Sequence, residues 1–274
     1  MAGYLPNDEV IRGLRLLVRD GRMSPPQYVM GTTMGLLFEQ IDSQPSSLGE
    51  ITLRRRRIPA LGDRDIYEVK LGEEFLMSSM FVDAEVALAD LGLNAVEGEQ
   101  LKVVVGGLGL GYTAEAALKH ERVSELLVVD ALDTVIHWHQ QEKVPLGKVL
   151  NADPRCRYVL GSFFDLAVSE SGFDTDTPGR VFDAILLDID HSPRALLNES
   201  NASFYNAESL GRMAAHLRPG GVFAMWSNDP PDEPFMDVLR TLFTDVDAKV
   251  VSFYNPFQNR ESTNTVFLAR KPLS

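Results

Sequence analysis

The densest group of reactive side chains follows an apolar stretch, in the segment FDAILLDIDHSP. Asp188, Asp190 and His191 fall within four positions at its end. Ionisable groups beside a buried strand are costly unless they are paired or used, so this group is a candidate catalytic site. A carboxylate there could hold or deprotonate an amine nucleophile, and histidine titrates in the range of a general base. The structural alternative is an aspartate that caps a helix beside two solvent-facing polar residues.

Metal binding is not expected at this group. No second cluster of metal-binding residue types accompanies it in the sequence. His137 and His139 lie two positions apart in a predicted helix, so their side chains face different directions and are not expected to ligate one ion jointly. The sequence therefore predicts a site that works without a metal.

A run of glycines follows another apolar strand, in VVVGGLGLGYTAEAAL beginning at Val103. Gly107, Gly109 and Gly111 lie where this strand gives way to a helical pattern. Glycines at such a turn let the backbone approach a ligand, and the start of the next helix offers unpaired N–H groups. The alternative is a tight turn that needs glycine for its geometry alone.

An acidic residue ends the next predicted strand. Asp130 closes LLVVD, 19 residues after Gly111, where a carboxylate can accept hydrogen bonds from two ribose hydroxyls. It could instead cap the helix in ALDTVI, a role that Asp133 would serve as well. The glycines and the acid together predict a nucleoside site. NAD is the rival ligand, but the short spacing between Gly111 and Asp130 favours a sulfonium nucleoside. An antiparallel hairpin, which the sequence predicts at the C-terminal end and which is described below, favours the same ligand.

Two further segments carry candidate pocket residues. The third strand ends in VLGSFFD, which places Ser162 to hydrogen-bond an adenine and Phe163 to contact its ring. Phe163 and Phe164 as plain core aromatics explain the pattern equally well. Tyr205, in NASFYN, is placed either to line the substrate pocket or to cap a helix.

These segments belong to an alternating pattern of strands and helices that starts at Lys102. Such alternation predicts right-handed βαβ units on a parallel sheet. The last two strands are joined by the polar turn QNRES, so they should form an antiparallel hairpin at one edge. The predicted fold is α/β, a Rossmann-like doubly wound sheet of the class I S-adenosylmethionine-dependent methyltransferase type with a C-terminal antiparallel hairpin.

The first part of the sequence follows a different pattern. A helix capped by Asn7 is expected to end near Gly21, and residues 1–48 are assigned to a helical extension. Residues 49–82 hold short strands of a small antiparallel β domain. Residues 83–274 are assigned to the Rossmann-like nucleoside-binding catalytic domain.

Composition and charge limit the classes of partner. The 274 residues are 45% hydrophobic and carry a net charge of −13, from 26 basic and 39 acidic residues. This charge argues against nucleic acid and anionic membranes as partners and fits a soluble protein. The sequence has no apolar run of 18 residues and its first residues lack the pattern of a signal peptide, so a cytoplasmic protein is expected. The basic run from Arg54 to Arg57 is short and is interpreted as a solvated strand face. A single cysteine, Cys156, excludes an internal disulfide.

The motifs together resemble a known family. Their order and spacing are similar to those of the spermidine synthase (polyamine aminopropyltransferase) family over roughly residues 50–270, and the likeness is carried by VVVGGLGLGYTAEAAL, VVDALDTVI, VLGSFFD, FDAILLDIDHSP, NASFYN and LRPGG. The divergent branch usually called spermidine synthase-like is the most similar. The resemblance implies a transferase with S-adenosylmethionine or its decarboxylated form as co-substrate. It also implies a small-molecule amine as acceptor and allows a homodimer.

Residue roles also follow from the resemblance. It implies that Gly107, Gly109 and Gly111 form the nucleoside-binding loop and that Asp130 holds the ribose. Asp188 would occupy the catalytic position of the family's Asp-x-x-Asp-Pro motif. Asp188 would then orient the acceptor, with Asp190 or His191 taking its proton.

Several positions depart from the family's pattern. His191 aligns with the second aspartate of the catalytic motif, and Ser162 stands where the family has an adenine-side aspartate. The substrate-gripping Tyr and Gln/His before the glycine loop are Asp83 and Ala84 here, with Glu85 retained. Asp83 and Glu85 are therefore assigned to the substrate side of the site. These departures support an alternative from another class, a binding or scaffolding homologue that has lost catalysis.

One departure has a direct physical consequence. The family's loop carries an aspartate at the position of Gly109, where it binds the amino end of decarboxylated S-adenosylmethionine. At about 4 Å and an effective dielectric of about 20, such a carboxylate would repel the extra carboxylate of intact S-adenosylmethionine by about 4 kcal/mol. Glycine removes this repulsion. The sequence thus favours methyl transfer from intact S-adenosylmethionine, with aminopropyl transfer as the alternative.

Overall fold

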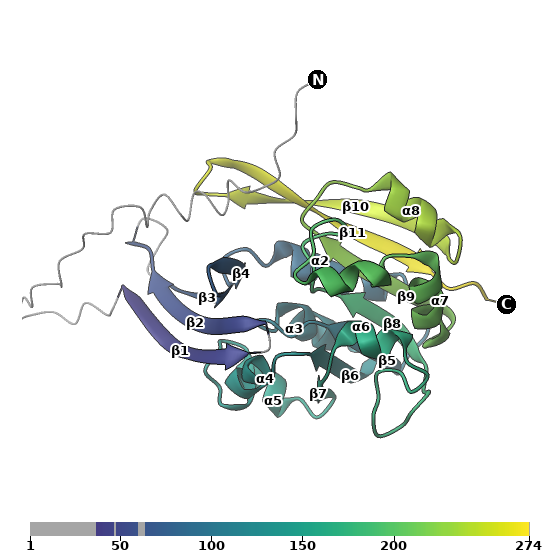
Figure 1. The fold of residues 1–274 in the computed structure, drawn as a ribbon, viewed down its shortest axis with the longest axis horizontal. Coiled ribbons are helices and arrows are strands. Elements are labelled where there is room, and N and C mark those ends of the chain that lie inside the picture. The colour runs from purple at the N-terminus through teal and green to yellow at the C-terminus, as the bar shows by residue number, and fades with distance from the viewer. Residues whose placement is uncertain (1–36, 47, 60–63, 274) are drawn as a thin grey trace, which may run out of the picture. The chain divides into compact units, whose positions relative to one another are not determined.

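The computed structural model shows two compact units, and its described residues form two β-sheets (Figure 1). Residues 37–46, 48–59 and 64–273 are described. The helix expected between Asn7 and Gly21 lies outside these residues.

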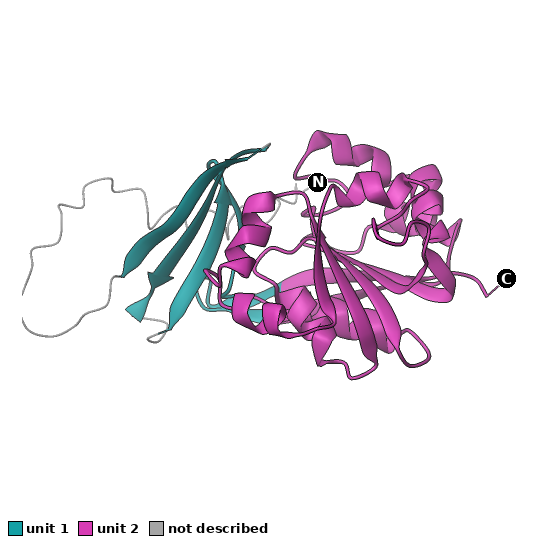
Figure 2. Cartoon of the chain, turned by 90° about the horizontal axis from the view of Figure 1, so that it is seen from below, with its two compact units in different colours: residues 1–80, 253–262 teal, residues 81–252, 263–274 magenta. Residues whose placement is uncertain are grey.

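The division between the units falls just before the first described helix (Figure 2). The first unit contains the described chain up to Met80 together with residues 253–262, and the second contains Phe81–Ser252 and the chain from Thr263. The predicted start of the catalytic domain at residue 83 lies within a few residues of this division. The sequence does not indicate that residues 253–262 group with the first unit, because it predicts them only as the turn and the adjoining strand ends of the C-terminal hairpin.

Four antiparallel strands in chain order form the sheet of the first unit. They are β1 (Phe38–Ser46), β2 (Gly49–Arg57), β3 (Asp65–Leu71) and β4 (Glu74–Ser78). The assignment of residues up to 48 to a helical extension is therefore wrong for β1, which pairs with β2. Its polar sequence and Pro45 conceal the strand, since an edge strand has one unpaired side and tolerates proline.

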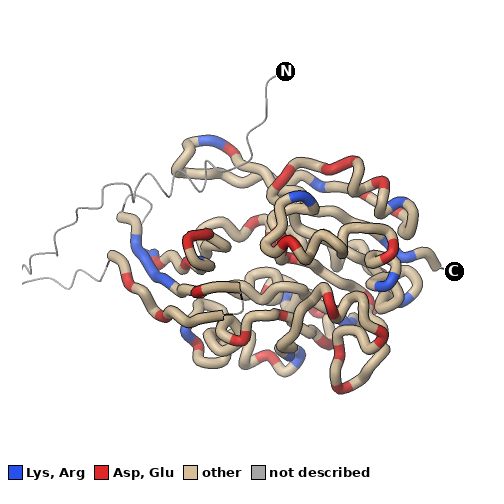
Figure 3. Tube along the Cα trace, in the orientation of Figure 1, with Lys and Arg blue, Asp and Glu red and all other residues tan. Residues whose placement is uncertain are grey.

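The basic run on β2 is paired with carboxylates of the same sheet (Figure 3). The nitrogen–oxygen distances are 2.6 Å for Arg55–Glu39, 2.7 Å for Arg56–Glu68 and 2.7 Å for Arg57–Asp65. Glu68 is 3% exposed, and burial raises its pKa against the lowering effect of the neighbouring arginines. The expected solvated strand face is thus a partly buried set of ion pairs.

A second sheet of seven strands has the order β10-β11-β9-β8-β5-β6-β7. The strands are β5 (Leu101–Gly106), β6 (Val123–Asp130), β7 (Cys156–Leu160), β8 (Phe182–Leu187), β9 (Leu217–Ser227), β10 (Thr244–Asn255) and β11 (Arg260–Arg270). Strands β5 to β9 pair in parallel, and β11 runs antiparallel to β9. The predicted Rossmann-like sheet with a C-terminal hairpin is confirmed.

Helices cover both faces of this sheet (Figure 1). They are α2 (Asp83–Asn94), α3 (Tyr112–Lys119), α4 (Asp133–Gln140), α5 (Gly147–Ala152), α6 (Phe163–Val168), the 3-10 helix η2 (Glu199–Phe204), α7 (Ala207–Ala215) and α8 (Glu233–Arg240). Helix α2 packs against α3, β8 and β9, whereas α6, α7 and α8 bury their apolar side chains in the core on the opposite face. Among the described helices, none is long and apolar enough to cross a membrane.

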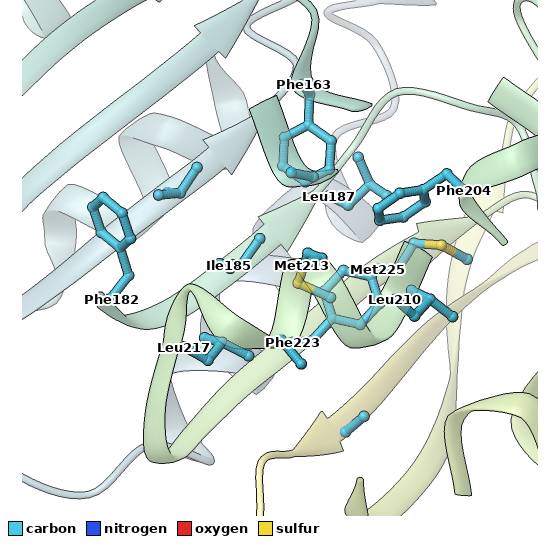
Figure 4. Close-up of a cluster of buried hydrophobic side chains, with 14 of the residues drawn as sticks. Phe163, Phe182, Ile185, Leu187, Phe204, Leu210, Met213, Leu217, Phe223 and Met225 are labelled. Carbon is cyan, nitrogen blue, oxygen red and sulfur yellow. The ribbon is translucent and has the colours of Figure 1, made fainter. Parts of the chain in front are cut away.

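A hydrophobic core lies between the sheet and α6, α7 and α8, and Figure 4 shows part of it. Alternate residues of β8 and β9 enter it, namely Ile185, Leu187, Phe223 and Met225. Phe163 of α6 is 1% exposed, and its ring centroid lies 5.0 Å from that of Phe173 and 5.9 Å from that of Phe204. The structure therefore supports Phe163 as a core aromatic, because a ring buried in this way offers no face to an adenine.

Candidate active site

The glycine loop joins the end of β5 to the start of α3, with its backbone partly in the left-handed region. The angle φ is +94° at Gly107, +48° at Gly109 and +92° at Gly111. A Cβ on Gly107 would lie 2.1 Å from the carbonyl oxygen of Asp188, so no larger residue fits there. Gly107 and Gly109 are partly exposed, whereas the leucines between the glycines are buried. The backbone of the loop is therefore itself accessible at this edge of the sheet.

Asp130, the last residue of β6, holds the glycine loop. Its carboxylate accepts hydrogen bonds from the N–H groups of Leu108 at 2.9 Å and Leu132 at 2.8 Å, and also from the Gly109 N–H. Burial raises the pKa of Asp130, and these three bonds oppose the rise. A carboxylate offers about four lone-pair positions, so about one remains for a ligand hydroxyl. Asp130 thus organises the loop, and its contact with a ribose stays a prediction.

Asp188, the first residue after β8, forms an acidic pair with Glu85 of α2. Burial raises the pKa of Glu85 to about 8, and the charges of Asp188 and Asp83 add to the rise. Burial also raises the pKa of Asp188 to about 6, although the Thr113 hydroxyl, which donates to it at 2.6 Å, opposes this shift. Near neutral pH the pair therefore holds one proton and one negative charge.

The strand pairing and two helix starts bring these groups together. The Asp188 N–H donates to the Gly106 carbonyl at 2.8 Å, which continues the pairing of β8 with β5 past the strand end. Thr113 lies in the first turn of α3 and is 3% exposed. Asp83 and Glu85 lie in the first turn of α2, where the helix dipole favours carboxylates. The glycine loop and the acidic pair thus share the carboxyl edge of the sheet.

Asp190 is a buried carboxylate that binds its own loop. It is 3% exposed and accepts hydrogen bonds from the Leu197 N–H at 2.7 Å, the Asn201 amide at 2.9 Å and the Tyr205 hydroxyl at 2.7 Å. Burial raises the pKa of Tyr205, and the charge of Asp190 raises it further, so this hydroxyl stays a donor. A role for Asp190 as base has to compete with three donors, which leaves Asp188 as the better placed carboxylate.

The remaining predicted residues, His191 and Ser162, make hydrogen bonds within the fold. His191 is partly buried, and its carbonyl accepts the Asn228 N–H at 2.7 Å. Ser162 caps α6, since its hydroxyl oxygen accepts the Asp165 N–H at 3.2 Å.

Within the part of the chain that the structure describes, no group of three or more His, Cys, Asp or Glu residues is arranged to hold a metal ion.

Two residues near the site are not apparent from sequence patterns. Thr113 lies two positions after Gly111, and a hydroxyl in that first helical turn was the available signal. Leu160 ends β7 opposite Asp130 and is 57% exposed, which leaves apolar surface beside the carboxylate. No sequence pattern distinguishes Leu160 from a buried strand residue, because its exposure depends on where the sheet ends.

Comparison with known proteins establishes the fold. No protein-family model matches the chain. A crystal structure of spermidine synthase from Thermotoga maritima aligns with a TM-score of 0.62 at 18% identity, over 86% of this chain and 73% of that one. A crystal structure of spermidine synthase in complex with the transition state analogue AdoDATO aligns with a TM-score of 0.63 at 18% identity, over 94% of this chain and 85% of that one. The chain therefore has a spermidine synthase-like fold.

Proposed function

We propose that the protein is a transferase that uses S-adenosylmethionine or its decarboxylated form and delivers a methyl or aminopropyl group to an amine. The observation that carries this proposal is the acidic pair Glu85 and Asp188, placed beside an accessible glycine loop. One of the solved structures with this fold is a spermidine synthase in complex with the transition state analogue AdoDATO. A carboxylate pair with a single negative charge suits a cationic amine that must lose a proton before it reacts.

The residues present fit a nucleoside at the glycine loop. Asp130 is partly exposed and keeps about one lone-pair position for a ribose hydroxyl. Gly107 and Gly109 leave their backbone accessible, and the exposed side of Leu160 offers apolar surface for a base in place of Phe163. The ligand would thus lie along the ends of β5, β6 and β7, which is the usual ligand position in an open α/β sheet.

In the proposed mechanism, Asp188 accepts the proton that the acceptor amine loses. The sulfonium co-substrate supplies an activated carbon and a neutral thioether leaving group. The carboxylate of Asp188 would hold the acceptor amine and take its proton, while the amine lone pair forms the new N–C bond as the C–S bond breaks. Glu85 stays protonated at neutral pH, so the charge of the pair resides on Asp188. Thr113 orients that carboxylate through its 2.6 Å hydrogen bond.

Methyl transfer from intact S-adenosylmethionine is the reaction that we favour. Gly109 presents no carboxylate to the amino-acid end of the co-substrate, so nothing at this position selects the decarboxylated form. Aminopropyl transfer, as in a polyamine aminopropyltransferase proper, is the alternative. An inactive binding or scaffolding homologue is a second alternative, which the three internal donors on Asp130 favour because they occupy much of its capacity.

Calorimetric titration of the protein with three nucleosides tests the proposal. We expect S-adenosylmethionine to bind at least as tightly as its decarboxylated form, and NAD not to bind. A strong preference for the decarboxylated form would reverse the choice in favour of aminopropyl transfer. Absence of binding by both sulfonium nucleosides would contradict the transferase proposal and favour the scaffold.

A further inference from the structure

We propose that His139 is a positioning residue of the nucleoside site, which fixes Gly109 in the loop that meets the ligand. This inference rests on the proposed function for the identity of the ligand. The hydrogen bond between His139 and Gly109 is present in the structure without a ligand. His139 lies in α4 and is fully buried, at 0% exposure. Its Nε2 lies 2.9 Å from the carbonyl oxygen of Gly109 and donates to it.

Gly109 is held from both sides by this arrangement. Its carbonyl accepts the hydrogen bond of His139, and its N–H donates to the carboxylate of Asp130. Gly109 has φ of +48° and no side chain to anchor it, so its orientation depends on these two bonds. A chain of two hydrogen bonds thus joins α4 to the end of β6 through Gly109, which is partly exposed.

Burying the imidazole of His139 costs free energy, and packing alone does not explain why a histidine stands here. Among the described residues, Nδ1 of His139 is buried with no hydrogen-bond partner. Burial lowers the pKa of His139 to about 4, so the ring is neutral near pH 7 and its proton lies on Nε2. A buried acceptor without a partner destabilises a protein, and an apolar side chain of similar size would avoid that cost. The bond to Gly109 is therefore the contribution that only the histidine makes.

The third glycine of the loop makes room for the same ring. A Cβ on Gly111 would lie 2.9 Å from Cε1 of His139 and 2.8 Å from a methyl carbon of Leu150. Both distances are shorter than carbon atoms tolerate, so a side chain at residue 111 would displace the imidazole or the loop. Gly111 thus leaves the space that the ring of His139 occupies.

Two substitutions at residue 139 separate positioning from packing. His139→Leu fills the site but cannot donate, whereas His139→Gln places an amide nitrogen at nearly the distance of Nε2 and can still donate to Gly109. We expect the leucine variant to bind S-adenosylmethionine tenfold or more weakly in calorimetry, with its melting temperature unchanged or raised. The glutamine variant should recover most of the affinity. A purely structural histidine would instead give both variants wild-type affinity or an equal loss that follows stability.

Amide hydrogen exchange gives a readout that needs no ligand. Protection of the Gly109 and Leu108 amides should fall in His139→Leu and return in His139→Gln, because both N–H groups bond Asp130 only while the loop is held. Equal protection in all three proteins would overturn the inference. If the wild type binds no sulfonium nucleoside, the proposed function fails, but the exchange result still decides whether His139 fixes the loop.

Discussion

At the scale of single residues, the site depends on two carboxylates that hold one proton between them. Asp188 and Glu85 both have raised pKa values, about 6 and about 8, with burial as the main cause. Their different values allow one group to act as acceptor of a proton while the other stays neutral. The rate of transfer should accordingly rise with pH through about 6, as Asp188 ionises.

Replacing Asp188 by asparagine tests this assignment. Asp188→Asn removes the proposed proton acceptor but keeps the shape of the side chain, so we expect turnover to fall by about 10² to 10⁴. Affinity for the nucleoside should change little, since Asp130 and the glycine loop are untouched. Steady-state kinetics and calorimetry of the same preparation measure both quantities. Retained turnover in Asp188→Asn would remove Asp188 from the mechanism.

Asp130 is expected to act on the ligand and on the loop together. Asp130→Ala removes the proposed ribose acceptor and frees the N–H groups of Leu108 and Gly109, so nucleoside binding should weaken at least tenfold, about 1.4 kcal/mol. Asp133→Ala, an exposed aspartate in the first turn of α4, is the matched control and should bind normally. Unchanged affinity in Asp130→Ala would place the nucleoside elsewhere.

At the scale of elements, the segment between β8 and α7 is held by Asp190. Asp190→Ala leaves the Leu197 N–H, the Asn201 amide and the Tyr205 hydroxyl without their acceptor. We expect a loss of stability on the order of 3 kcal/mol, from buried bonds to a charged group. Tyr205→Phe removes one of the three bonds and should cost less. Chemical denaturation measures both, and a stable but inactive Asp190→Ala would instead indicate a catalytic carboxylate.

The sequence predicts the elements of the second unit better than those of the first. Apolar strands and the turns between them identify β5 to β9, because a parallel sheet is buried on both faces. β1 is missed since an edge strand with Pro45 has no such pattern. Within the site, the strand-end position of Asp188 follows from the sequence. The three donors on Asp190 and the bond from His139 to Gly109 do not, because they join residues brought together only by the tertiary fold.

At the scale of the whole molecule, the acidic pair should make stability depend on pH. The pKa of Glu85 is raised from an ordinary value of 4.5 to about 8 in the folded protein. Its contribution to stability is therefore fully present below pH 4.5 and is lost as pH rises through about 8. Glu85→Gln lacks this dependence, so its stability relative to wild type should increase from pH 5 to pH 9 in chemical denaturation.

A matched control isolates the effect of burial at residue 85. Glu121→Gln changes an exposed carboxylate, and its stability relative to wild type should not follow the same trend with pH. If the two glutamine variants depend on pH in the same way, the pKa of Glu85 is not raised and the proton does not reside there.

The likeness to spermidine synthase structures fixes the fold of this acidic chain, whereas the ligand has to be seen directly. A crystal structure of the protein soaked with S-adenosylmethionine is the most direct measurement. The adenosine should lie against the backbone of Gly107 and Gly109, with a ribose hydroxyl bonded to Asp130 and the sulfonium facing Asp188. A nucleoside bound at any other place, or a loop edge filled by the protein's own side chains, would contradict the account.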